Sequence, residues 1–512
     1  MNFSTLTLLQ VRNMLISGEI TSVSLVEEYK KIVIDDNKNA IPLKGFIELY
    51  DDSLEKAAAC DAEIAEVRKT GKEAVLALFE KKPLLGVPFG IKDNISVQGK
   101  TCTCGSKILE SYIAPYNATV IQRLLNAGAI PFGRTNMDEF AMGSSTEYSC
   151  YGASHNPVNR AYTPGGSSGG SAASVAGGQV PFALGTETGG SVRLPAAYCG
   201  IYGYKPTYGT LSRWGVVSFG SSLDQVGILG KEPADIALPL AVMAGEDFYD
   251  DTSANTDVKP CVEIIKNNKF SAISVKNMKI AIPKQFLETK GLDNEIATKF
   301  EETKKWFISQ GAVLETVEIP VLDATIACYY VIALSEATSN LSRFDGIRYG
   351  ARKDSGDGYD GLYVKTRSEG FGAEVKRRII IGNYVLSSNF SGDCYKKAMS
   401  VRARIQREIS NIFKKYDVIL CPTSPTSAFK LGSKVDNPMS MYLSDLFTTF
   451  VNLARVPSVS VPAGISKDGL PIGIQLTGAH FKDAELLQVA QAWHEAHPEV
   501  ALQIANVAGA SK

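Results

Sequence analysis

Two stretches of this 512-residue sequence place an apolar strand, an amphipathic helix and a second apolar strand one after another. In the clearer one, PLLGVPFGIKDN from Pro83 has the pattern of a buried strand, NATVIQRLLNAG (117–128) that of an amphipathic helix ending at glycine, and AIPFGRT (129–135) that of a second strand. Strands joined by a helix usually lie parallel in one sheet, since a parallel connection needs a long crossover. This pattern therefore predicts an α/β fold with parallel strands.

The rest of the chain continues the same alternation. MKIAIP (278–283), a helix at 292–310 and AVLETVEI (312–319) form the second unit. A helix at about 393–416 runs into DVILCP (417–422), and LPIGIQLTG (470–478) precedes a helix at 482–496. The first 70 residues read as helices. Without a repeat, a linker or a clear boundary, we expect one domain over 1–512, with helices of 1–70 packed on it and polar surface insertions at 250–277 and 352–363.

Composition excludes several classes of protein. Lys plus Arg number 53 and Asp plus Glu number 54, so the net charge is −1 and no basic surplus indicates a nucleic-acid binder. The nine cysteines are scattered without metal-ligand spacing, which predicts free thiols in a reducing, cytoplasmic setting and no metal site. We expect no signal peptide, and no membrane span because no run of 18 apolar residues occurs.

Glycine is concentrated where we expect the functional site. Residues 160–230 hold 16 of the 45 glycines, in two Gly-rich segments at Pro164–Gly178 and Ala183–Gly200. In the second, Ser191 follows two glycines after an apolar strand, and such a turn points backbone N–H groups into one concavity. Donors from Thr188, Gly189, Gly190 and Ser191 would hold an oxyanion beside a nucleophilic hydroxyl. The alternatives are a tight turn with a capping serine and, for GGSSGGS (165–171), a flexible linker.

A nucleophilic serine needs a base, and lysine is the better candidate here. The four histidines lie outside any nucleophile-elbow pattern, and His494 and His497 are one residue too close for the zinc-protease motif. Lys92 ends the strand LLGVPFGI; its pKa would have to fall about 3 units, which burial can supply. Ser167 or Ser168 would relay the proton from the nucleophile. A lysine at a strand end can equally be solvated.

Lys92, the GGSSGGS tract and the Gly-Gly-Ser at 189–191 together resemble the amidase signature family. The resemblance implies an α/β domain with a mixed, mostly parallel twisted sheet covered by helices on both faces. It also implies that Ser191 is the acyl-forming nucleophile, that Ser167 follows a cis peptide bond and acts as the relay, and that Lys92 is the final base.

Five further motifs are similar to one branch of that family, the A subunits of aspartyl/glutamyl-tRNA(Asn/Gln) amidotransferases. They are NMDEFAMGSSTE (136–147), VSFGSSLDQVG (217–227), LSRFDGIRYG (341–350), EVKRRIIIGNYVLSS (374–388) and MYLSDLFTTFVNLARVPSVSVPAG (441–464). The resemblance implies glutamine as the amide donor, with Arg378 binding its carboxylate, Asp445 its ammonium and Tyr329 lining the pocket.

This resemblance also implies partners. Ammonia would pass to a B subunit that uses ATP and Mg²⁺ on mischarged tRNA, with a small C subunit holding the two together. No phosphate-binding G-x-x-x-x-G-K-[ST] motif occurs in this chain, so we expect no cofactor here. A free-standing amidase, which would need neither Arg378 nor Asp445, and a catalytically silent scaffold are the alternatives.

Overall fold

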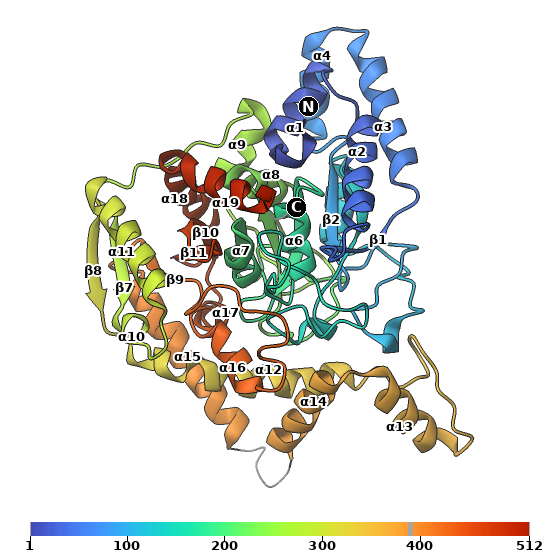
Figure 1. The fold of residues 1–512 in the computed structure, drawn as a ribbon, viewed down its shortest axis with the longest axis vertical. Coiled ribbons are helices and arrows are strands. Elements are labelled where there is room, and N and C mark those ends of the chain that lie inside the picture. The colour runs from blue at the N-terminus through green and yellow to red at the C-terminus, as the bar shows by residue number, and fades with distance from the viewer. Residues whose placement is uncertain (1, 388–392, 511–512) are drawn as a thin grey trace.

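The computed structural model describes residues 2–387 and 393–510, and these residues form an α/β fold around one long sheet (Figure 1). Within them the sheet has eleven strands in the order β1-β3-β2-β4-β6-β5-β10-β11-β9-β7-β8. The strands are β1 (Phe46–Leu49), β2 (Pro88–Lys92), β3 (Ile130–Thr135), β4 (Phe182–Glu187), β5 (Tyr202–Lys205), β6 (Gln225–Gly230), β7 (Lys279–Pro283), β8 (Val313–Val317), β9 (Val418–Pro422), β10 (Ser458–Ile465) and β11 (Pro471–Gly478).

Helices precede, connect and follow these strands. They are α1 (Leu8–Ser17), α2 (Ser22–Asp36), α3 (Ser53–Arg68), α4 (Lys72–Lys81), α5 (Thr119–Asn126), α6 (Gly169–Ala176), α7 (Arg193–Cys199), α8 (Pro233–Met243), α9 (Lys259–Asn267), α10 (Lys284–Leu287), α11 (Asn294–Ser309), α12 (Thr325–Leu341), α13 (Gly358–Gly370), α14 (Ala373–Leu386), α15 (Cys394–Ile412), α16 (Pro438–Tyr442), α17 (Thr449–Ala454), α18 (Asp483–Ala496) and α19 (Pro498–Ala510).

The sheet is mixed, as expected, but less parallel than predicted. Both strand–helix–strand units are confirmed, since β2 pairs with β3, and β7 with β8, in parallel. Parallel pairing also joins β2 to β4 and β7 to β9, but the other six of the ten neighbouring pairs in the described sheet are antiparallel. The centre of the sheet is antiparallel partly because β10 and β11 follow each other through a short turn, which leaves no room for a crossover helix.

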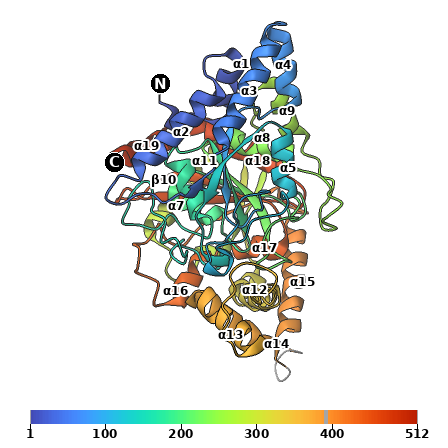
Figure 2. The same cartoon turned by 90° about the vertical axis from the view of Figure 1, so that its right-hand side faces the viewer.

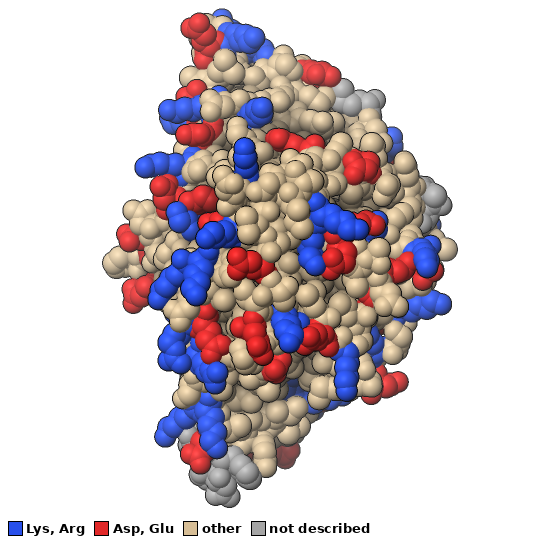
Figure 3. All heavy atoms as spheres, turned by 90° about the vertical axis from the view of Figure 1, so that its left-hand side faces the viewer, with Lys and Arg blue, Asp and Glu red and all other residues tan. Residues whose placement is uncertain are grey.

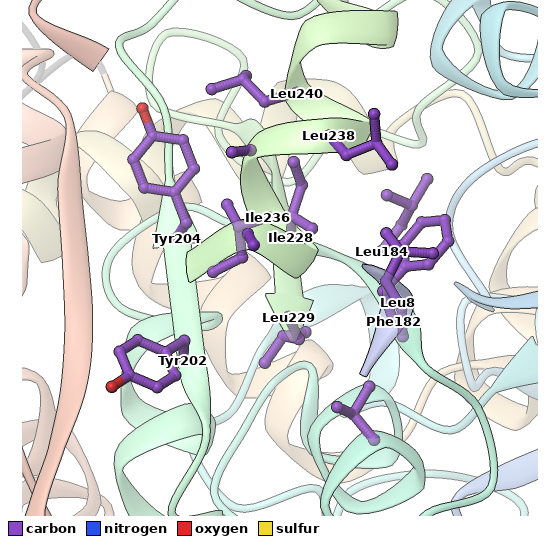
Figure 4. Packing of buried hydrophobic residues seen from close by; sticks show 14 of the residues in the cluster. Leu8, Phe182, Leu184, Tyr202, Tyr204, Ile228, Leu229, Ile236, Leu238 and Leu240 are labelled. Carbon is purple, nitrogen blue, oxygen red and sulfur yellow. The ribbon is translucent and has the colours of Figure 1, made fainter. Parts of the chain in front are cut away.

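Helices cover both faces of the sheet, as the family resemblance implies. Adjacent positions of a strand face opposite sides. In β6, a Cβ added at Gly227 would lie 2.9 Å from Val192, next to α7, whereas a Cβ at Gly230 would lie 2.6 Å from the Cβ of Asp235 in α8. Figure 4 shows the α8 side, where apolar side chains of β4, β6 and α8 pack with Leu8 of α1. The Gly-rich tract before α6 lies on the α7 side, since a Cβ at Gly185 would meet both Ser168 and Val192.

The N-terminal helices α1 to α4 form one end of the molecule and pack on this core (Figure 1). Asp235 of α8 accepts a hydrogen bond of 2.7 Å from Leu8 N at the start of α1. The prediction that the first 70 residues are helical missed β1, which pairs antiparallel with β3. A four-residue strand is too short to show a period, so pairing with β3, and not the local pattern, defines it.

The prediction that the two polar stretches are surface insertions is wrong in part. Residues 250–277 contain α9, whose Cys261 and Ile264 are fully buried and which packs on α8. Residues 352–363 include the start of α13, where Leu362 is buried. The polar composition of these stretches did not indicate packed helices, because each helix buries only a few apolar side chains.

One helical stretch among the described residues, Pro320–Leu341, is long and apolar enough to cross a membrane by length and composition alone. It comprises a short 3-10 turn and α12. In the protein, 61% of its most apolar window is buried, and α12 packs against α14, α15 and α17 (Figure 2). This packing accounts for its apolar composition, as in the core helix of a globular fold.

Charged side chains of both signs are interspersed on the face shown in Figure 3. Lys and Arg lie beside Asp and Glu over most of this face, in keeping with the net charge of −1. A face of this kind offers no extended positive field for binding a phosphate backbone.

Candidate active site

The candidate site lies where β2 and β4 end, since these strands are parallel neighbours. Lys92 is the last residue of β2, and the turn that contains Ser191 follows β4 directly. The GGSSGGS tract ends within the first turn of α6, which packs on both strands. Carboxyl ends of parallel strands meet at one edge of a sheet, which brings segments distant in sequence together.

Lys92 is fully buried and contacts three oxygen atoms. Its Nζ lies 2.7 Å from Ser167 Oγ, 2.8 Å from Ser168 Oγ and 3.1 Å from the carbonyl oxygen of Thr186. The solvated-strand-end alternative is therefore excluded for Lys92. The structure places both candidate relay serines against the candidate base, and the peptide bond between Gly166 and Ser167 is cis, as the family resemblance implies.

Hydrogen bonding distinguishes the two serines. Ser168 Oγ donates to Thr186 O at 3.1 Å and accepts from Thr186 N at 3.3 Å, so its hydroxyl proton is already hydrogen-bonded to β4. Ser167 Oγ contacts Lys92 and forms no hydrogen bond with another described residue. A neutral amine has two donors and one acceptor, which fits donation to Ser168 and Thr186 and acceptance from Ser167. Ser167 is thus the hydroxyl free to exchange a proton with Lys92.

Burial lowers the pKa of Lys92 to about 7, although the charges of Asp138 and Asp224 raise it in part. The first cause is the loss of hydration, because an ammonium group is poorly stabilised away from water. A lysine with this pKa is about half neutral at pH 7, and the neutral amine can accept a proton.

The turn after β4 combines a serine with unused backbone donors. Gly190 has φ +149°, and a Cβ there would lie 2.3 Å from Thr448 Oγ1, so only glycine fits. The N–H groups of Gly189, Gly190 and Ser191 donate to no residue that the structure describes. Ser191 is 8% exposed, and its carbonyl accepts from Ser168 N at 3.1 Å. Its hydroxyl makes no hydrogen bond to a described residue, so the contact with Ser167 that a relay requires is not formed here.

A buried ion pair that the sequence gave no sign of holds this turn. Glu187, the last residue of β4, accepts hydrogen bonds of 3.1 Å from Val192 N and Arg193 N, and binds the Arg193 guanidinium. Arg193 in turn donates to Thr448 O and to Asn452. Both charges are fully buried and paired, and they connect the turn and the start of α7 to the end of β4.

Tyr329 and Asp445, two of the three expected glutamine-binding residues, lie against the same turn. A Cβ added at Gly189 would lie 2.5 Å from the ring of Tyr329 in α12, and one at Gly190 would lie 3.2 Å from Asp445 Oδ1. Asp445 is buried and accepts a hydrogen bond of 2.7 Å from Ser144. Burial raises the pKa of Asp445 to about 7, whereas the Ser144 hydroxyl and the charge of Arg378 oppose this rise.

Arg378, the third expected residue, is a buried cation with two unused guanidinium nitrogens. Its Nε donates to Glu374 at 2.8 Å, and its guanidinium lies 5.2–5.8 Å from the ring centres of Phe219, Tyr330 and Tyr442. Burial alone would lower its pKa, but its interactions with Tyr330 and Glu374 outweigh burial and raise it. The two Nη nitrogens donate to no described residue, so they remain available for a carboxylate.

Among the described residues, no group of three or more His, Cys, Asp or Glu side chains has the geometry to hold a metal ion. The donors of the site are instead hydroxyls, an amine and backbone N–H groups. Such donors suit acyl transfer through a covalent ester.

Comparison with known proteins identifies the class. The amidase family model matches residues 44–487, and the chain belongs to that family. Within it, the A subunit of a glutamyl-tRNA(Gln) amidotransferase from Treponema denticola is 59% identical over 490 residues, which are 96% of this chain and 99% of that protein. The corresponding protein from Clostridium botulinum, of the same description, is 44% identical over 509 residues, covering 98% of this chain and 100% of that protein.

Solved structures agree with this class. The crystal structure of the glutamyl-tRNA(Gln) amidotransferase A subunit from Thermotoga maritima covers 97% of this chain and 95% of its own, with a TM-score of 0.74 and 36% identity. The native peptide amidase from Stenotrophomonas maltophilia covers 96% and 97%, with a TM-score of 0.78 and 25% identity. Fold similarity alone does not separate the two activities, whereas sequence identity favours the amidotransferase subunits.

Proposed function

We propose that this chain is the glutaminase component of a tRNA-dependent amidotransferase, which releases ammonia from glutamine to convert Glu-tRNA(Gln) to Gln-tRNA(Gln). The observation that carries the proposal is that the Asp445 carboxylate lies against the Ser191 turn, within the electrostatic influence of Arg378, a buried cation with two unused guanidinium nitrogens. Free glutamine has one α-carboxylate and one α-ammonium, and this site offers the buried Arg378 cation for the first and the buried Asp445 carboxylate for the second. The names of the relatives from Treponema denticola, Clostridium botulinum and Thermotoga maritima, each an amidotransferase A subunit, support the same function.

Acylation begins with glutamine held by Arg378 and Asp445. Ser191 Oγ attacks the side-chain amide carbon, and its proton passes through the Ser167 hydroxyl to the neutral amine of Lys92. This requires the Ser191 and Ser167 hydroxyls to come into contact. The N–H groups of Gly189, Gly190 and Ser191 then stabilise the oxyanion. Lys92 returns the proton through Ser167 to the departing nitrogen, so the C–N bond breaks to give ammonia and a glutamyl ester on Ser191.

Deacylation repeats the same path with water. The relay of Ser167 and Lys92 takes a proton from water as its oxygen attacks the ester carbon, and then returns a proton to Ser191 Oγ. The C–O bond breaks and glutamate leaves. The residues therefore return to their starting protonation states, and the half-reaction balances without an oxidant or a reductant.

The relatives' description as one lettered subunit of an amidotransferase supports an enzyme of several chains. In this proposal a B subunit uses ATP and Mg²⁺ to activate glutamate, and as a second substrate aspartate, on mischarged tRNA. A small C subunit holds this chain and the B subunit together, and the complex works in the cytoplasm. The chain itself carries no cofactor. The net charge of −1 suits binding of tRNA mainly through the B subunit.

The alternative is a free-standing amidase that hydrolyses other carboxamides. The similarity to a peptide amidase structure is the observation that favours it. Such an enzyme would use the same serines and lysine without needing a cation and a carboxylate for the α-groups of an amino acid.

Ammonia release from glutamine, measured on the chain with its co-expressed partners, ATP and mischarged tRNA, tests the proposal. We expect Ser191→Ala to lower the rate by at least about 10³-fold with an unchanged circular dichroism spectrum. Ser458→Ala, a change to a buried serine in β10, is the matched control and should retain activity. Normal turnover by Ser191→Ala would exclude Ser191 as nucleophile, and equal turnover of simple amides lacking α-groups would favour the free-standing amidase.

A further inference from the structure

The loop Asp138–Tyr148, here called the positioning loop, has an unusual backbone for a segment outside the proposed chemistry. Phe140, Ala141 and Thr146 have φ of +50°, +61° and +58°. Residues other than glycine seldom adopt such angles, and a β-branched threonine does so least. Left-handed non-glycine residues persist only where surrounding contacts enforce them, and they concentrate at functional sites. The grouping of three such residues in this loop therefore indicates that the loop has a functional role.

Asp138, at one end of the loop, is fully buried beneath the catalytic serine tract. Its carboxylate accepts hydrogen bonds from Thr146 N at 2.8 Å, Tyr148 N at 3.2 Å and Ser145 N at 3.3 Å. Its own N–H donates to Ser167 O at 3.3 Å. A Cβ added at Gly166 would lie 2.2 Å from Asp138 Oδ2, so the carboxylate packs directly on the peptide that precedes Ser167.

Two other residues of the loop contact Asp445 and the helix that carries Arg378, the proposed glutamine-binding residues. Ser144 donates to Asp445 at 2.7 Å, across 301 positions of sequence. Glu139 accepts from Gly372 N at 2.8 Å, at the start of α14, the helix that carries Arg378. A single short segment therefore contacts the candidate relay serine on one side and the elements that carry both charged pocket residues on the other.

We propose that the positioning loop aligns the glutamine pocket with the catalytic serines: Asp138 is a positioning residue for Ser167, and Ser144 and Glu139 are positioning residues for Asp445 and α14. This inference rests on the proposed glutaminase function and deepens it. No residue of the loop takes or gives a proton in the reaction. Asp138 acts by holding the serine tract and by placing a negative charge near Lys92, and Ser144 acts by orienting the Asp445 carboxylate.

The charged surroundings determine the direction of each effect on pH dependence. Around Lys92 stand Asp138, Asp224 and Glu187, with the Cys104 thiol, and each negative charge raises the pKa of Lys92. Around Asp445 stand Ser144, Arg378 and Arg193, which lower its pKa, and Glu187, which raises it; Lys434 also lies nearby. Burial raises the pKa of Asp138 itself to about 6, so its negative charge is largely present at pH 7 and is lost as the pH falls below 6. Removing Asp138 would thus lower the pKa of Lys92 near neutrality, and removing the Ser144 hydroxyl would raise that of Asp445.

Asp138→Asn is the first test, measured as steady-state ammonia release from glutamine by the complete complex over a pH series. We expect kcat to fall about 100-fold, because a small misplacement of a reacting group has effects of that size. The ascending limb of the kcat profile should move to lower pH by about half a unit or more. Asp235→Asn is the matched control: Asp235 is equally buried and also accepts from three backbone amides, but lies in α8 on the opposite face of the sheet.

Gly143→Ala separates the effect of the position of the Asp138 carboxylate from the effect of its charge. A Cβ at Gly143 would lie 2.4 Å from the carboxyl carbon of Asp138, so alanine displaces the carboxylate without removing it. We expect kcat to fall about tenfold or more with the pH limb shifted less than in Asp138→Asn. This variant also keeps the test open if Asp138→Asn fails to fold.

Ser144→Ala tests the pocket side of the loop. We expect KM for glutamine at pH 7 to rise about tenfold with kcat changed less than about threefold, since Asp445 loses its hydrogen-bond donor and a larger fraction is protonated. A loss of kcat with unchanged KM would overturn this assignment.

The controls distinguish failure of this inference from failure of the proposed function. If the wild-type complex releases no ammonia from glutamine through Ser191, the proposed function fails. If it does, and Asp138→Asn matches Asp235→Asn in kcat and pH profile, only the role of the positioning loop is overturned.

Discussion

Lys92 and Arg378 are both buried cations, yet the protein treats them in opposite ways. Lys92 is fully buried and contacts two hydroxyls and a carbonyl, none of them charged. Arg378 is 3% exposed, but it pairs with the Glu374 carboxylate at 2.8 Å and lies over three aromatic rings. The pKa of Lys92 falls to about 7, whereas the pKa of Arg378 rises.

The comparison teaches that burial by itself does not decide protonation. Loss of hydration disfavours both charges, and the contact partners determine whether that loss is compensated. The uncompensated lysine becomes a base, and the compensated arginine stays a fixed cation for binding. Lys92 thus serves proton transfer and Arg378 serves substrate recognition, and each residue can be substituted separately.

The largest expected effect comes from making the base permanently charged. Lys92→Arg should lower kcat for ammonia release by about 10³-fold or more, because a guanidinium does not accept a proton near neutrality. Lys205→Arg is the matched control: Lys205 is also buried, burial lowers its pKa to about 7, and its Nζ contacts the Pro206 carbonyl. That variant should reduce stability, measured as Tm, and keep kcat within about threefold. Substantial activity in Lys92→Arg would contradict the role of Lys92.

The next effect tests recognition. Arg378→Lys keeps the positive charge but loses the two Nη donors, so we expect KM for glutamine to rise about 100-fold with kcat within about threefold. Arg377→Lys is the control, because Arg377 also pairs with Glu374 but its side chain is 42% exposed. If the two variants had equal KM, Arg378 would not be the carboxylate ligand.

The smallest effect is the pH dependence. Lys92 must be neutral and Asp445 ionised in the free enzyme, and both have a pKa of about 7, so kcat/KM should rise with pH through that region. From pH 7 to pH 6 we expect kcat/KM to fall about thirtyfold and kcat only about fivefold, since bound ammonium keeps Asp445 ionised. Initial rates across a pH series measure both. Activity that increases toward lower pH would require a different base.

Local pattern predicted much of this molecule, and its failures share one cause. Glycine and serine spacing located the GGSSGGS tract and the Ser191 turn, the end of an apolar strand located Lys92, and hydrophobic periodicity located both strand–helix–strand units. The antiparallel centre of the sheet, the short strand β1 and the burial of α9 were missed. Each depends on pairing or packing with residues far along the chain, which a local pattern does not contain.

The same limit applies to the site. The family resemblance named Arg378 and Asp445, and the structure lays Asp445 and Tyr329 against the Ser191 turn. Ser144 and Asp138 carried no signal beyond lying in motifs, because their contacts with Asp445 and Ser167 join segments as much as 301 positions apart. The residue pattern left Ser167 and Ser168 open as the relay, and only the family resemblance implied Ser167. The structure separates the two because β4 already binds the Ser168 hydroxyl.

What the sequence by itself determined was the chemistry available: a lysine at a strand end, serines in glycine turns, and strands and helices in an order that forms one sheet. These follow from backbone angles and side-chain periodicity, which act over a few residues. Only the tertiary structure decided that Lys92 is buried without a counter-charge in contact, that Arg378 is buried with one, and that one strained loop contacts both regions. Protonation depends on hydration and on neighbours in space, and the fold supplies both.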